Sequence, residues 1–430
     1  TGGLVMEVRA VGSATVLARI IAMVAEAQGG KLPVQALVDR ITLWFVPVVM
    51  ALAVLTFAVW LALGPGLAQA LVAGVSVLII ACPCAMGLAT PVSILVGTGR
   101  AAELGVLFRK GEALQRLESV TRVAFDKTGT LTMGKPVVQA VQAVSGDADG
   151  LLTLAAAVER GSEHPLASAV LDEAARRGLA VPQATGFQAH PGRGAEALVD
   201  GVRVMVGSAK LFAPLEDGLA RMCELAQAEG KGVLLVGREA RAEAAILVAD
   251  PIKPSARDTI QALEKLGIGA VMITGDAQAT AKAVAAQLGI TSIHAEIMPA
   301  QKAEVVQGLG PGTVFVGDGL NDAPALAIAD VGMAMGTGTD VAIEAGDVVL
   351  MRGDPQGAAQ AIGLSRAVMR NIRQNLFWAF GYNAVLIPVA AGALVPFGGP
   401  QLSPMLGAGA MALSSVFVLT NALRLRLWRG

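Results

Sequence analysis

Charged residues are scarce in this chain of 430 residues, since Asp, Glu, Lys and Arg together make up only 16% of it. Soluble proteins usually contain about a quarter charged residues. Hydrophobic residues make up 54% of the chain, so we expect membrane segments beside soluble domains. The formal net charge of −1 provides no basic field, and no nucleic-acid partner is expected.

Cysteine is also rare, with three residues in the whole chain. Cys82 and Cys84 are one residue apart inside an apolar run, so the chain lacks the disulfide framework of a small secreted protein. Cys223 lies in an amphipathic stretch, where a packed free thiol is the ordinary interpretation.

Four apolar runs contain no Asp, Glu, His, Lys or Arg, and each is about as long as a membrane-spanning helix. They are 41–63, 67–91, 376–397 and 404–423. Short uncharged turns join the runs of each pair, whereas basic residues flank their other ends. By the positive-inside rule, the basic side is the cytoplasm. We therefore predict an integral membrane protein, surrounded by lipid, with a cytoplasmic body at about 100–370.

This body has the pattern of an α/β domain with an insertion. Short strand-like runs occur at 120–125, 268–273 and 313–316, and each is followed by polar residues. Parallel sheets build their sites from such loops at the carboxyl ends of strands. A segment at about 145–248 has its own helix signals and strand-like runs at 197–199, 202–206 and 232–236, which predicts an inserted domain.

The polar residues after these strands suit phosphoryl transfer. Residues 126–132 read DKTGTLT, so the Asp126 carboxylate is exposed at a strand end, where it can attack a γ-phosphate. Lys127 and the amides of the turn can offset phosphoryl charge. The third strand is followed by oxygen ligands of the kind that Mg²⁺ prefers, on Asp318, Asn321 and Asp322. Two further elements are Thr274-Gly275-Asp276 after the second strand and Lys302 a helix later.

DKTGTLT, TGD and GDGLNDAP in this order resemble the phosphorylation domain of P-type ATPases, which has a haloacid-dehalogenase-like fold. The resemblance implies that Asp126 is phosphorylated and that Asp126, Asp318 and the Thr128 carbonyl hold Mg²⁺. It also implies that Thr274 and Lys302 contact the phosphoryl group. Related phosphatases have an acid/base aspartate at the position of Thr128, so the acyl phosphate is expected to be long-lived.

The insertion contains SEHP at 162–165 and PGRG at 191–194. These resemble the nucleotide-binding domain of heavy-metal P-type ATPases, which is an α+β domain. The ATP contacts that the resemblance implies are Glu159, His164, Gly192, Gly194 and Gly207. The family often has Gly-Asn where this chain has Gly207-Ser208, which leaves one contact open. His190 and His294 have no motif partner and are interpreted as structural.

The apolar runs carry a soft-metal motif. Residues two apart on a regular helix point to nearly opposite sides, but Pro83 removes a backbone donor and opens the helix. Both sulfurs of Cys82 and Cys84 can then face one cavity, and broken helices mark transporter sites. Tyr382-Asn383 lies in the third run. Met411 and Ser415 are four apart in the fourth run and share a helix face. These pairs resemble the pattern of copper-transporting members.

Ligand chemistry favours Cu(I) or Ag(I), because thiolate and thioether are soft donors. Zinc pumps of the same subclass use charged residues in the membrane, and the four runs have none. The resemblance implies export from the cytosol by a bacterial plasma-membrane pump, and it allows a cytosolic copper chaperone as a partner. The alternatives are a Zn/Cd-transporting ATPase, a membrane-anchored phosphatase and a non-catalytic metal-binding membrane protein.

These predictions together give a multi-domain membrane protein with an α-helical bundle, a phosphorylation domain and an inserted nucleotide-binding domain. The family's actuator loop and first spans are expected to be missing, so the chain is interpreted as part of a longer pump. The predicted boundaries are 1–12 (actuator remnant), 13–100 (juxtamembrane helix and first span pair), 101–144 with 249–370 (phosphorylation domain), 145–248 (nucleotide-binding domain) and 371–430 (second span pair).

Overall fold

The computed structural model describes residues 33–429 except 145, 163, 191 and 213. The predicted actuator remnant, 1–12, and the start of the juxtamembrane segment lie outside the described residues. The chain divides into two compact units. The first contains the described residues up to Val120, Asp347–Met351 and the residues from Gly357 onward, and the second contains Thr121–Gly346 and Arg352–Gln356.

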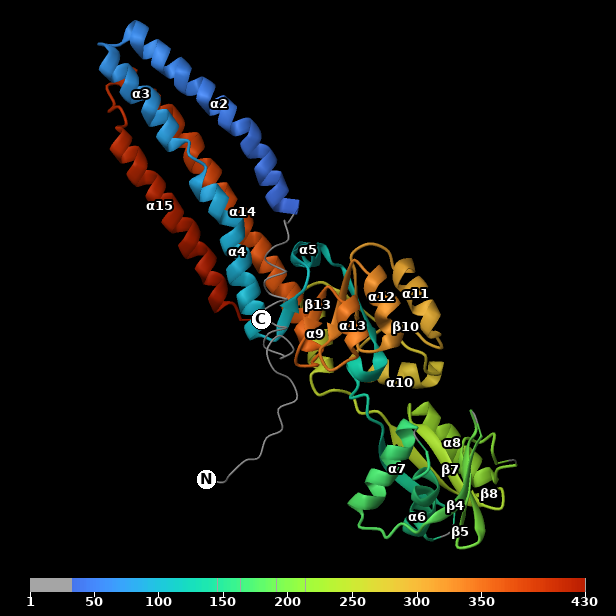
Figure 1. Cartoon of the computed structure of the whole chain (residues 1–430). Coiled ribbons are helices and arrows are strands. Elements are labelled where there is room, and N and C mark those ends of the chain that lie inside the picture. Colours follow the sequence, from blue (N-terminus) through green and yellow to red (C-terminus); the bar gives the residue numbers. More distant parts are fainter. Residues whose placement is uncertain (1–32, 145, 163, 191, 213, 430) are drawn as a thin grey trace, which may run out of the picture. The chain divides into compact units, whose positions relative to one another are not determined.

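Long helices build the first unit (Figure 1). They are α2 (Pro33–Leu63), α3 (Leu67–Ile80), α4 (Cys84–Glu103), α14 (Gln356–Ala390) and α15 (Pro404–Leu423). α3 packs against α2 and α15, and α4 packs against α15. The unit also contains the short helix α5 (Gly111–Arg116) and an antiparallel pair of strands, β1 (Val106–Phe108) and β13 (Val348–Leu350).

Within the described residues, three helical stretches are long and apolar enough to cross a membrane. They are Pro33–Leu63, Leu67–Glu103 and Pro404–Leu427. The predicted third span, 376–397, does not meet this standard. It begins inside α14, whose preceding part is polar and includes Arg370 and Arg373, and the helix ends at Ala390. The continuous apolar part of α14 is therefore shorter than the apolar run in the sequence.

The stretch from Leu67 to Glu103 is interrupted at the cysteine motif. α3 ends at Ile80 and α4 begins at Cys84, so Pro83 lies in the break. Proline has no N–H to donate to the preceding turn. The predicted opening of the helix at Pro83 is confirmed.

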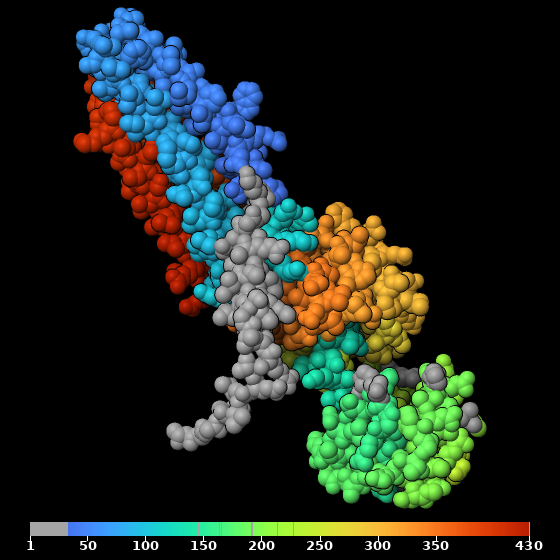
Figure 2. Space-filling view, in the orientation of Figure 1, coloured from blue at the N-terminus to red at the C-terminus, as the bar shows by residue number. Residues whose placement is uncertain are grey.

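The bundle has apolar side chains both inside and outside. Val77, Ile80 and Ala390 belong to a buried core. On α2, by contrast, Leu43 and Trp44 are 74% and 76% exposed, and Figure 2 shows the side chains of this helix, in blue, at the surface of the bundle. A large exposed apolar surface on long helices suits contact with lipid.

A parallel sheet forms one part of the second unit. Its strands run in the order β12-β11-β2-β9-β10. They are β2 (Arg122–Asp126), β9 (Gly269–Ile273), β10 (Ser292–His294), β11 (Thr313–Gly317) and β12 (Val331–Met335). The accompanying helices are α9 (Ala256–Lys265), α10 (Gln278–Leu288), α11 (Lys302–Gly308), α12 (Ala323–Ile328) and α13 (Asp340–Ala345). All three strands predicted here are present, with shifts of one or two residues at their ends.

An antiparallel sheet forms the other part, in the order β3-β8-β7-β6-β5-β4. Its strands are β3 (Val137–Ala143), β4 (Ala184–His190), β5 (Gly194–Val199), β6 (Val202–Gly207), β7 (Gly232–Arg238) and β8 (Arg241–Ala249). Its helices are α6 (Ala148–Glu159), α7 (Pro165–Arg176) and α8 (Asp217–Ala228). α6 and α7 pack on one face with Val204 and Val206, and α8 packs with Met205 on the other, as strand alternation requires.

The first strand of this antiparallel sheet lies outside the predicted insertion. The sequence boundary at 144/145 assigns residues 137–143 to the phosphorylation domain. In the structure they form β3, which pairs with β8 from Val137↔Ala249 to Ala143↔Ala244. The inserted sheet therefore begins before the predicted boundary, because its edge is completed by a strand distant in sequence from its partner.

Candidate active site and metal site

The carboxyl ends of β2, β9 and β11 lie level with one another. Asp126 is opposite Ile273 in the β2–β9 pair, and Phe125 is opposite Val316 in the β11–β2 pair. The polar residues that follow these strands therefore meet at one edge of the sheet. This edge holds Asp126, Thr274 and Asp318, as the sequence predicts.

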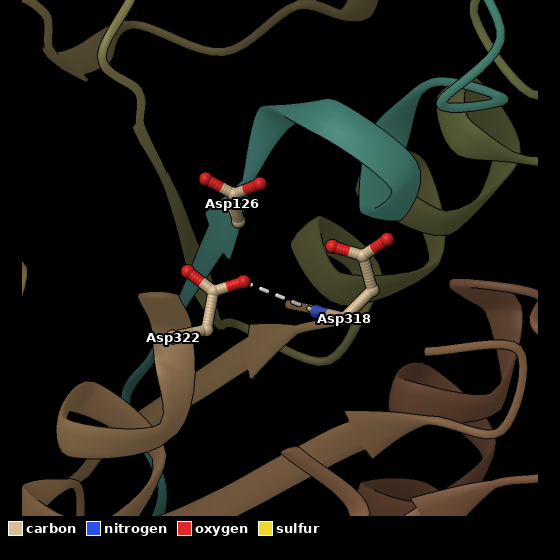
Figure 3. Close-up of side chains that lie close together, drawn as sticks. All are labelled: Asp126, Asp318 and Asp322. Carbon is tan, nitrogen blue, oxygen red and sulfur yellow. Dashed lines mark hydrogen bonds between the residues drawn. The ribbon is translucent and has the colours of Figure 1, made fainter. Parts of the chain in front are cut away.

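Asp126 is at the predicted strand end but is not exposed as expected, because the neighbouring loops bury it to 5% exposure. It lies beside two other carboxylates (Figure 3). Lys302 at the start of α11 donates to the Asp126 Oδ1 over 2.6 Å and to the Asp322 Oδ1 over 2.7 Å. The other oxygen of Asp322, Oδ2, accepts the backbone N–H groups of Asp318 (3.2 Å) and Gly319 (3.1 Å). One ammonium thus links two carboxylates at the strand ends.

The electrostatics of these groups favour added positive charge. Burial raises the pKa of Asp126 to about 7; repulsion from Asp322 also raises it, and attraction to Lys302 opposes the shift. Burial also raises the pKa of Asp318, to which Asp322 adds. Burial lowers the pKa of Lys302, but Asp126 and Asp322 outweigh burial, and the net change is upward. A cation at this edge would relieve the repulsion among the carboxylates.

Asp126, Asp318 and Asp322 can each offer one oxygen to a single ion, because these oxygens lie within 4.8 Å of one another. Three hard oxygen donors suit Mg²⁺. The donor set thus fits the metal that the sequence predicts here. Asp322 already bonds Lys302 and two amides, which leaves Asp126 and Asp318 as the better ligands.

The loop after Asp126 passes close to Asp318 and requires glycine. Gly129 has φ +73°, and a Cβ built on it would lie 1.8 Å from the Asp318 Oδ2. Any side chain there would displace the carboxylate as well as strain the backbone. Thr128, whose carbonyl is a predicted Mg²⁺ ligand, is exposed in the same loop.

The remaining predicted catalytic residues occupy different positions. The Thr274 hydroxyl is buried at the end of β9 and accepts the N–H of Asp276 over 3.1 Å. Lys127 forms an ion pair with Asp276. Gly275 is exposed beside them, and Asn321 is exposed on the short turn Leu320–Asp322. Asn321 is therefore outside the carboxylate cluster.

Two residues of this site were not singled out from the sequence. Lys253 donates to the carbonyl oxygens of Gly129 and, over 2.8 Å, Gly353, and burial lowers its pKa. Asp250 accepts the Thr132 hydroxyl (2.5 Å). Both follow β8 directly, in DPIK at 250–253. A polar motif at the return point of the insertion is the signal that could have identified them.

The antiparallel part of the unit contains a cavity of about 400 Å³. All five predicted nucleotide contacts line it: Glu159, His164, Gly192, Gly194 and Gly207. Phe187, Ser208 and His190 line it too, and burial raises the pKa of Glu159. An aromatic ring, a carboxyl group, a histidine and closely approaching backbone are a set of partners that suits a heteroaromatic base.

The glycines of this cavity allow two strands to approach. A Cβ on Gly194, at φ +147°, would lie 2.1 Å from the Val206 carbonyl oxygen, and one on Gly207 would lie 2.2 Å from that of Arg193. Ser208 donates its N–H to Arg193 over 2.7 Å, so its backbone completes this turn. His190 Nε2 lies 3.2 Å from a carboxylate oxygen of Glu196. His190 also lines the cavity, although the sequence indicated only a structural role for it.

In the first unit, the break at Pro83 brings the two cysteine sulfurs together. Their Cα atoms are 5.5 Å apart, and the structure joins them in a disulfide. The expectation that both sulfurs share one location is confirmed, whereas the thiolate form expected of a Cu(I) donor is not the form found here. The reason is geometric, because the opened turn places both side chains on one side.

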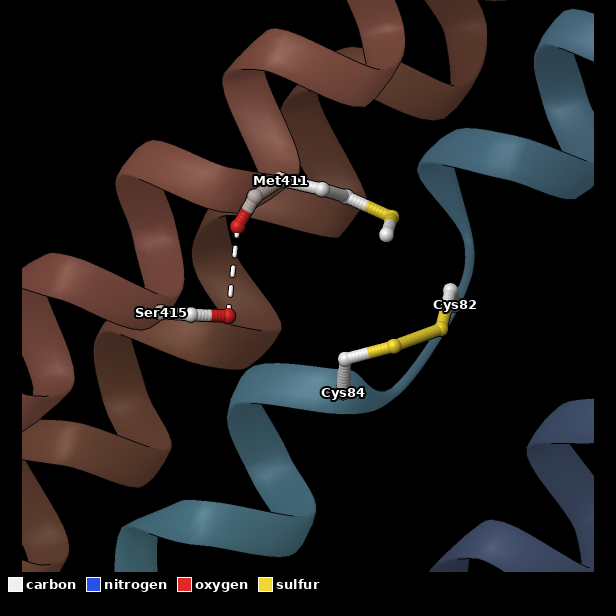
Figure 4. The surroundings of a disulfide bond; sticks show 4 residues. All are labelled: Cys82, Cys84, Met411 and Ser415. Carbon is white, nitrogen blue, oxygen red and sulfur yellow. Dashed lines mark hydrogen bonds between the residues drawn. A yellow bond between two sulfur atoms is a disulfide. The ribbon is translucent and has the colours of Figure 1, made fainter.

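Figure 4 shows the Met411 side chain extending from α15 toward Cys82 and Cys84. Ser415, one turn along α15, donates to the Met411 carbonyl over 3.3 Å. On α14, Tyr382 is half-buried and Asn383 is buried. Within the described part of the chain, neither of these two side chains forms a hydrogen bond to the cysteine turn. A reduced cysteine pair with Met411 would present three soft donors.

Comparison with known proteins agrees with this architecture. Residues 120–330 match the family model of haloacid dehalogenase-like hydrolases. The chain is 54% identical to a copper-transporting ATPase 2 from Rhizobium meliloti, over 99% of this chain and 53% of that protein. It is 50% identical to a copper-exporting P-type ATPase from Legionella pneumophila, over 99% of this chain and 59% of that protein.

A solved structure is similar over nearly the whole chain. It is a zinc-transporting PIB-type ATPase in an E2·Pi state, with a TM-score of 0.80 and 37% identity, and the match covers 98% of this chain and 69% of that one. The chain spans 53% and 59% of the lengths of these copper-transporting relatives from Rhizobium meliloti and Legionella pneumophila.

Proposed function

Because the chain belongs to the heavy-metal-transporting P-type ATPases, we propose that it is the core of a pump that moves Cu(I), or Ag(I), out of the cytosol. ATP hydrolysis drives the pump through a phosphorylated Asp126. The observation that carries this proposal is the buried Asp126 carboxylate, held by Lys302 at a strand end that also presents Asp318. A carboxylate in that position is a nucleophile whose negative charge Lys302 compensates.

In the phosphorylation step, an oxygen of Asp126 bonds to the γ-phosphorus of ATP. The bond from that phosphorus to the bridging oxygen breaks, and ADP leaves with the bridging oxygen and its electron pair. Lys302 lies 2.6 Å from Asp126 and favours the ionised nucleophile. In this proposal it also contacts the transferred phosphoryl group. Thr274 follows Ile273, the register partner of Asp126, and so lies at the same edge of the sheet.

Mg²⁺ held by Asp126, Asp318 and the Thr128 carbonyl would neutralise charge on the phosphoryl oxygens. Gly129 lets the loop approach Asp318 closely enough for these ligands to face one another. The chain offers Thr128 where related phosphatases have an acid/base aspartate. The acyl phosphate therefore lacks a built-in base and persists long enough to be coupled to a conformational change.

ATP is proposed to place its adenine in the cavity lined by Glu159, His164 and Phe187. The cavity and the carboxylate cluster belong to the same unit but to different sheets. Binding of the base and transfer of the phosphate can therefore be separated by mutation.

The cargo follows from donor chemistry. Cys82, Cys84 and Met411 are sulfur donors, which suit a monovalent soft ion. The three described stretches that can span a membrane contain no acidic residue in their apolar parts, so no carboxylate there could accompany a divalent ion. A Zn/Cd cargo is the second candidate, because the similar solved structure is a zinc transporter. A membrane and a cytosolic copper chaperone are the further proposed partners.

The cargo is tested with Cys82→Ser/Cys84→Ser in the reduced protein. High-affinity Cu(I) binding should be lost, while phosphorylation by inorganic phosphate survives because Asp126 lies in the other unit. Cys223→Ser removes a buried thiol on α8, and this matched control should bind Cu(I) normally. X-ray absorption at the copper edge reports the first shell, and a shell without sulfur would overturn the copper assignment.

The enzyme class is tested separately with γ-labelled ATP. Asp126→Asn should remove the acid-stable, hydroxylamine-sensitive label, whereas Asp258→Asn, an exposed aspartate on α9, should keep it. Persistent labelling of the Asp126 variant would show that another residue is the nucleophile.

A further inference from the structure

Four buried polar side chains connect three helices of the first unit. They are Ser93 on α4, Asn371 and Asn375 on α14, and Asn421 on α15, and we call them the amide cluster. Ser93 and Asn375 have no exposed surface, and Asn371 and Asn421 are only 6% and 8% exposed. Buried amides among apolar helices are costly unless they are hydrogen-bonded.

The hydrogen bonds of the amide cluster form a closed network. Asn371 Oδ1 accepts the Ser93 hydroxyl (2.9 Å) and the Asn375 amide (3.2 Å). Asn375 also donates to the Ser93 Oγ (3.2 Å), and its Oδ1 accepts the Asn421 amide (2.8 Å). Asn371 donates in turn to the Asn421 backbone carbonyl (2.9 Å). α14 is thus bonded directly to both α4 and α15, and these two helices are linked through it.

All three side-chain amides of the cluster are satisfied as both donors and acceptors. The last free oxygen, Asn421 Oδ1, accepts Arg424 over 3.2 Å. A cluster whose groups already bond one another has little to offer a passing ion. The cluster is suited to holding helices together, because loss of a whole side chain leaves a buried group unpaired, as loss of Asn375 would leave the Asn421 amide.

The three helices that the amide cluster links also carry residues of the proposed metal site. Cys84 is on α4, Tyr382 is on α14 and Met411 is on α15. Ser93 is nine residues after Cys84 on α4, Asn375 is seven residues before Tyr382 on α14, and Asn421 is six residues after Ser415 on α15. At 1.5 Å per residue these separations are about 9–14 Å along each helix. The amide cluster therefore lies two to three turns from the proposed metal site on all three helices.

We propose that the amide cluster is a positioning element for the metal site, which fixes the rotation and axial register of α4, α14 and α15. Cys84 and Met411 lie on two of these helices, so their mutual placement depends on that register. A carboxamide network is directional, so it favours one rotation and one axial position of each helix that it joins. This inference rests on the proposed function, since the site is the one assigned to Cu(I).

The test compares amide-to-leucine variants in purified, reduced protein. Asn375→Leu and Asn421→Leu should each raise the Cu(I) dissociation constant roughly tenfold, measured by competition with a chromogenic Cu(I) chelator. The double variant should also show about a tenfold loss instead of a hundredfold loss, because each substitution breaks the same network. Gln374→Leu and Thr420→Val, exposed neighbours on the same helices, should leave affinity unchanged.

A purely structural role would lower the melting temperature of the cluster variants and leave the dissociation constant of the folded fraction unchanged. That result, or additive effects in the double variant, would overturn the inference. If the leucine variants do not fold, Ser93→Ala takes their place, with an expected loss of about threefold. An unchanged affinity in Ser93→Ala then overturns the inference equally.

Hydrogen exchange in metal-free protein separates this inference from the proposed function. In the cluster variants, amides at 76–88, around the cysteine turn, should exchange faster than in the parent and the two controls. If the unmodified protein binds no Cu(I), the cargo assignment fails, and exchange alone decides the positioning role. Unchanged exchange at 76–88 would reject it.

Discussion

Asp126→Asn should make the metal-free protein more stable at neutral and alkaline pH, although it removes the proposed nucleophile. The carboxylate is buried beside Asp322 and Asp318, and these surroundings raise the pKa of Asp126 to about 7 from 3.8. The ionised form of Asp126 therefore destabilises the folded state. Asparagine has the same size without the charge, and Lys302 keeps its bond to Asp322.

The pKa shift of Asp126 sets the size of the expected stabilisation. A rise from 3.8 to about 7 is about three units, and each unit corresponds to about 1.4 kcal/mol, which gives an upper limit of about 4 kcal/mol. Water entry and movement of the Lys302 ammonium reduce the cost of the buried charge, so we expect roughly half, about 2 kcal/mol. For a unit of this size, that corresponds to an increase in Tm of about 4–8 °C.

The raised pKa of Asp126 also sets the direction in which stability changes with pH. Folded Asp126 keeps its proton to a higher pH than the unfolded chain does, so the parent protein loses stability as pH rises from about 4 to about 7. The advantage of Asp126→Asn should be complete at pH 8, about half as large at pH 5.5 and absent near pH 4. Thermal unfolding in the presence of a chelator, followed at these three values, measures it.

Two controls accompany this measurement. Asp258→Asn, on the exposed side of α9, should change the unfolding free energy by less than about 0.5 kcal/mol. Mg²⁺ should stabilise the parent more than Asp126→Asn, because the variant lacks one carboxylate ligand. A variant that is less stable than the parent at pH 8, or whose advantage grows as the pH falls, would refute the electrostatic argument.

Three further substitutions separate the parts of the site. Gly129→Ala should abolish phosphorylation, because its methyl would lie 1.8 Å from a carboxylate oxygen, whereas Gly267→Ala, with the same φ of +73° and no neighbour within 4 Å, should retain it. Lys253→Met should slow phosphorylation about tenfold without weakening ATP binding. The exposed control Lys265→Met should phosphorylate at the parent rate. Equal rates in the two variants would contradict the role of Lys253. His164→Asn keeps an acceptor for the cap of α7 but loses the ring, so ATP affinity measured by calorimetry should fall about tenfold, while labelling by inorganic phosphate persists; loss of both would indicate unfolding.

Local sequence patterns were sufficient for features whose residues are neighbours in the chain. The strand predicted at 120–125 is β2, and Asp126 is at its end, because a β-type run followed by a polar turn is a local property. The break between Cys82 and Cys84 follows from the missing N–H of Pro83 in the same way. Apolar composition likewise indicated the helices that can span a membrane, but it overestimated the length of the span inside α14.

Local patterns could not predict contacts between segments that are distant in the chain. The sequence singled out Lys302 as a polar element one helix after Thr274, and the family resemblance implied its role. The tertiary structure places it 2.6 Å from a carboxylate 176 residues earlier. Lys253, the strand β3 and the amide cluster were not recognised at all. The bond between Ser93 and Asn371 joins residues 278 positions apart.

The sequence by itself thus determined the chemical groups of this protein, and the tertiary structure decided which groups meet. Nucleophile, oxygen ligands and sulfur donors are recognisable because their motifs are continuous in the chain. Pairing of helices and strands depends on side-chain packing between segments that have no local relationship. A serine and three asparagines on separate helices therefore look unremarkable in the sequence, and only their burial together in the folded bundle makes them a single element.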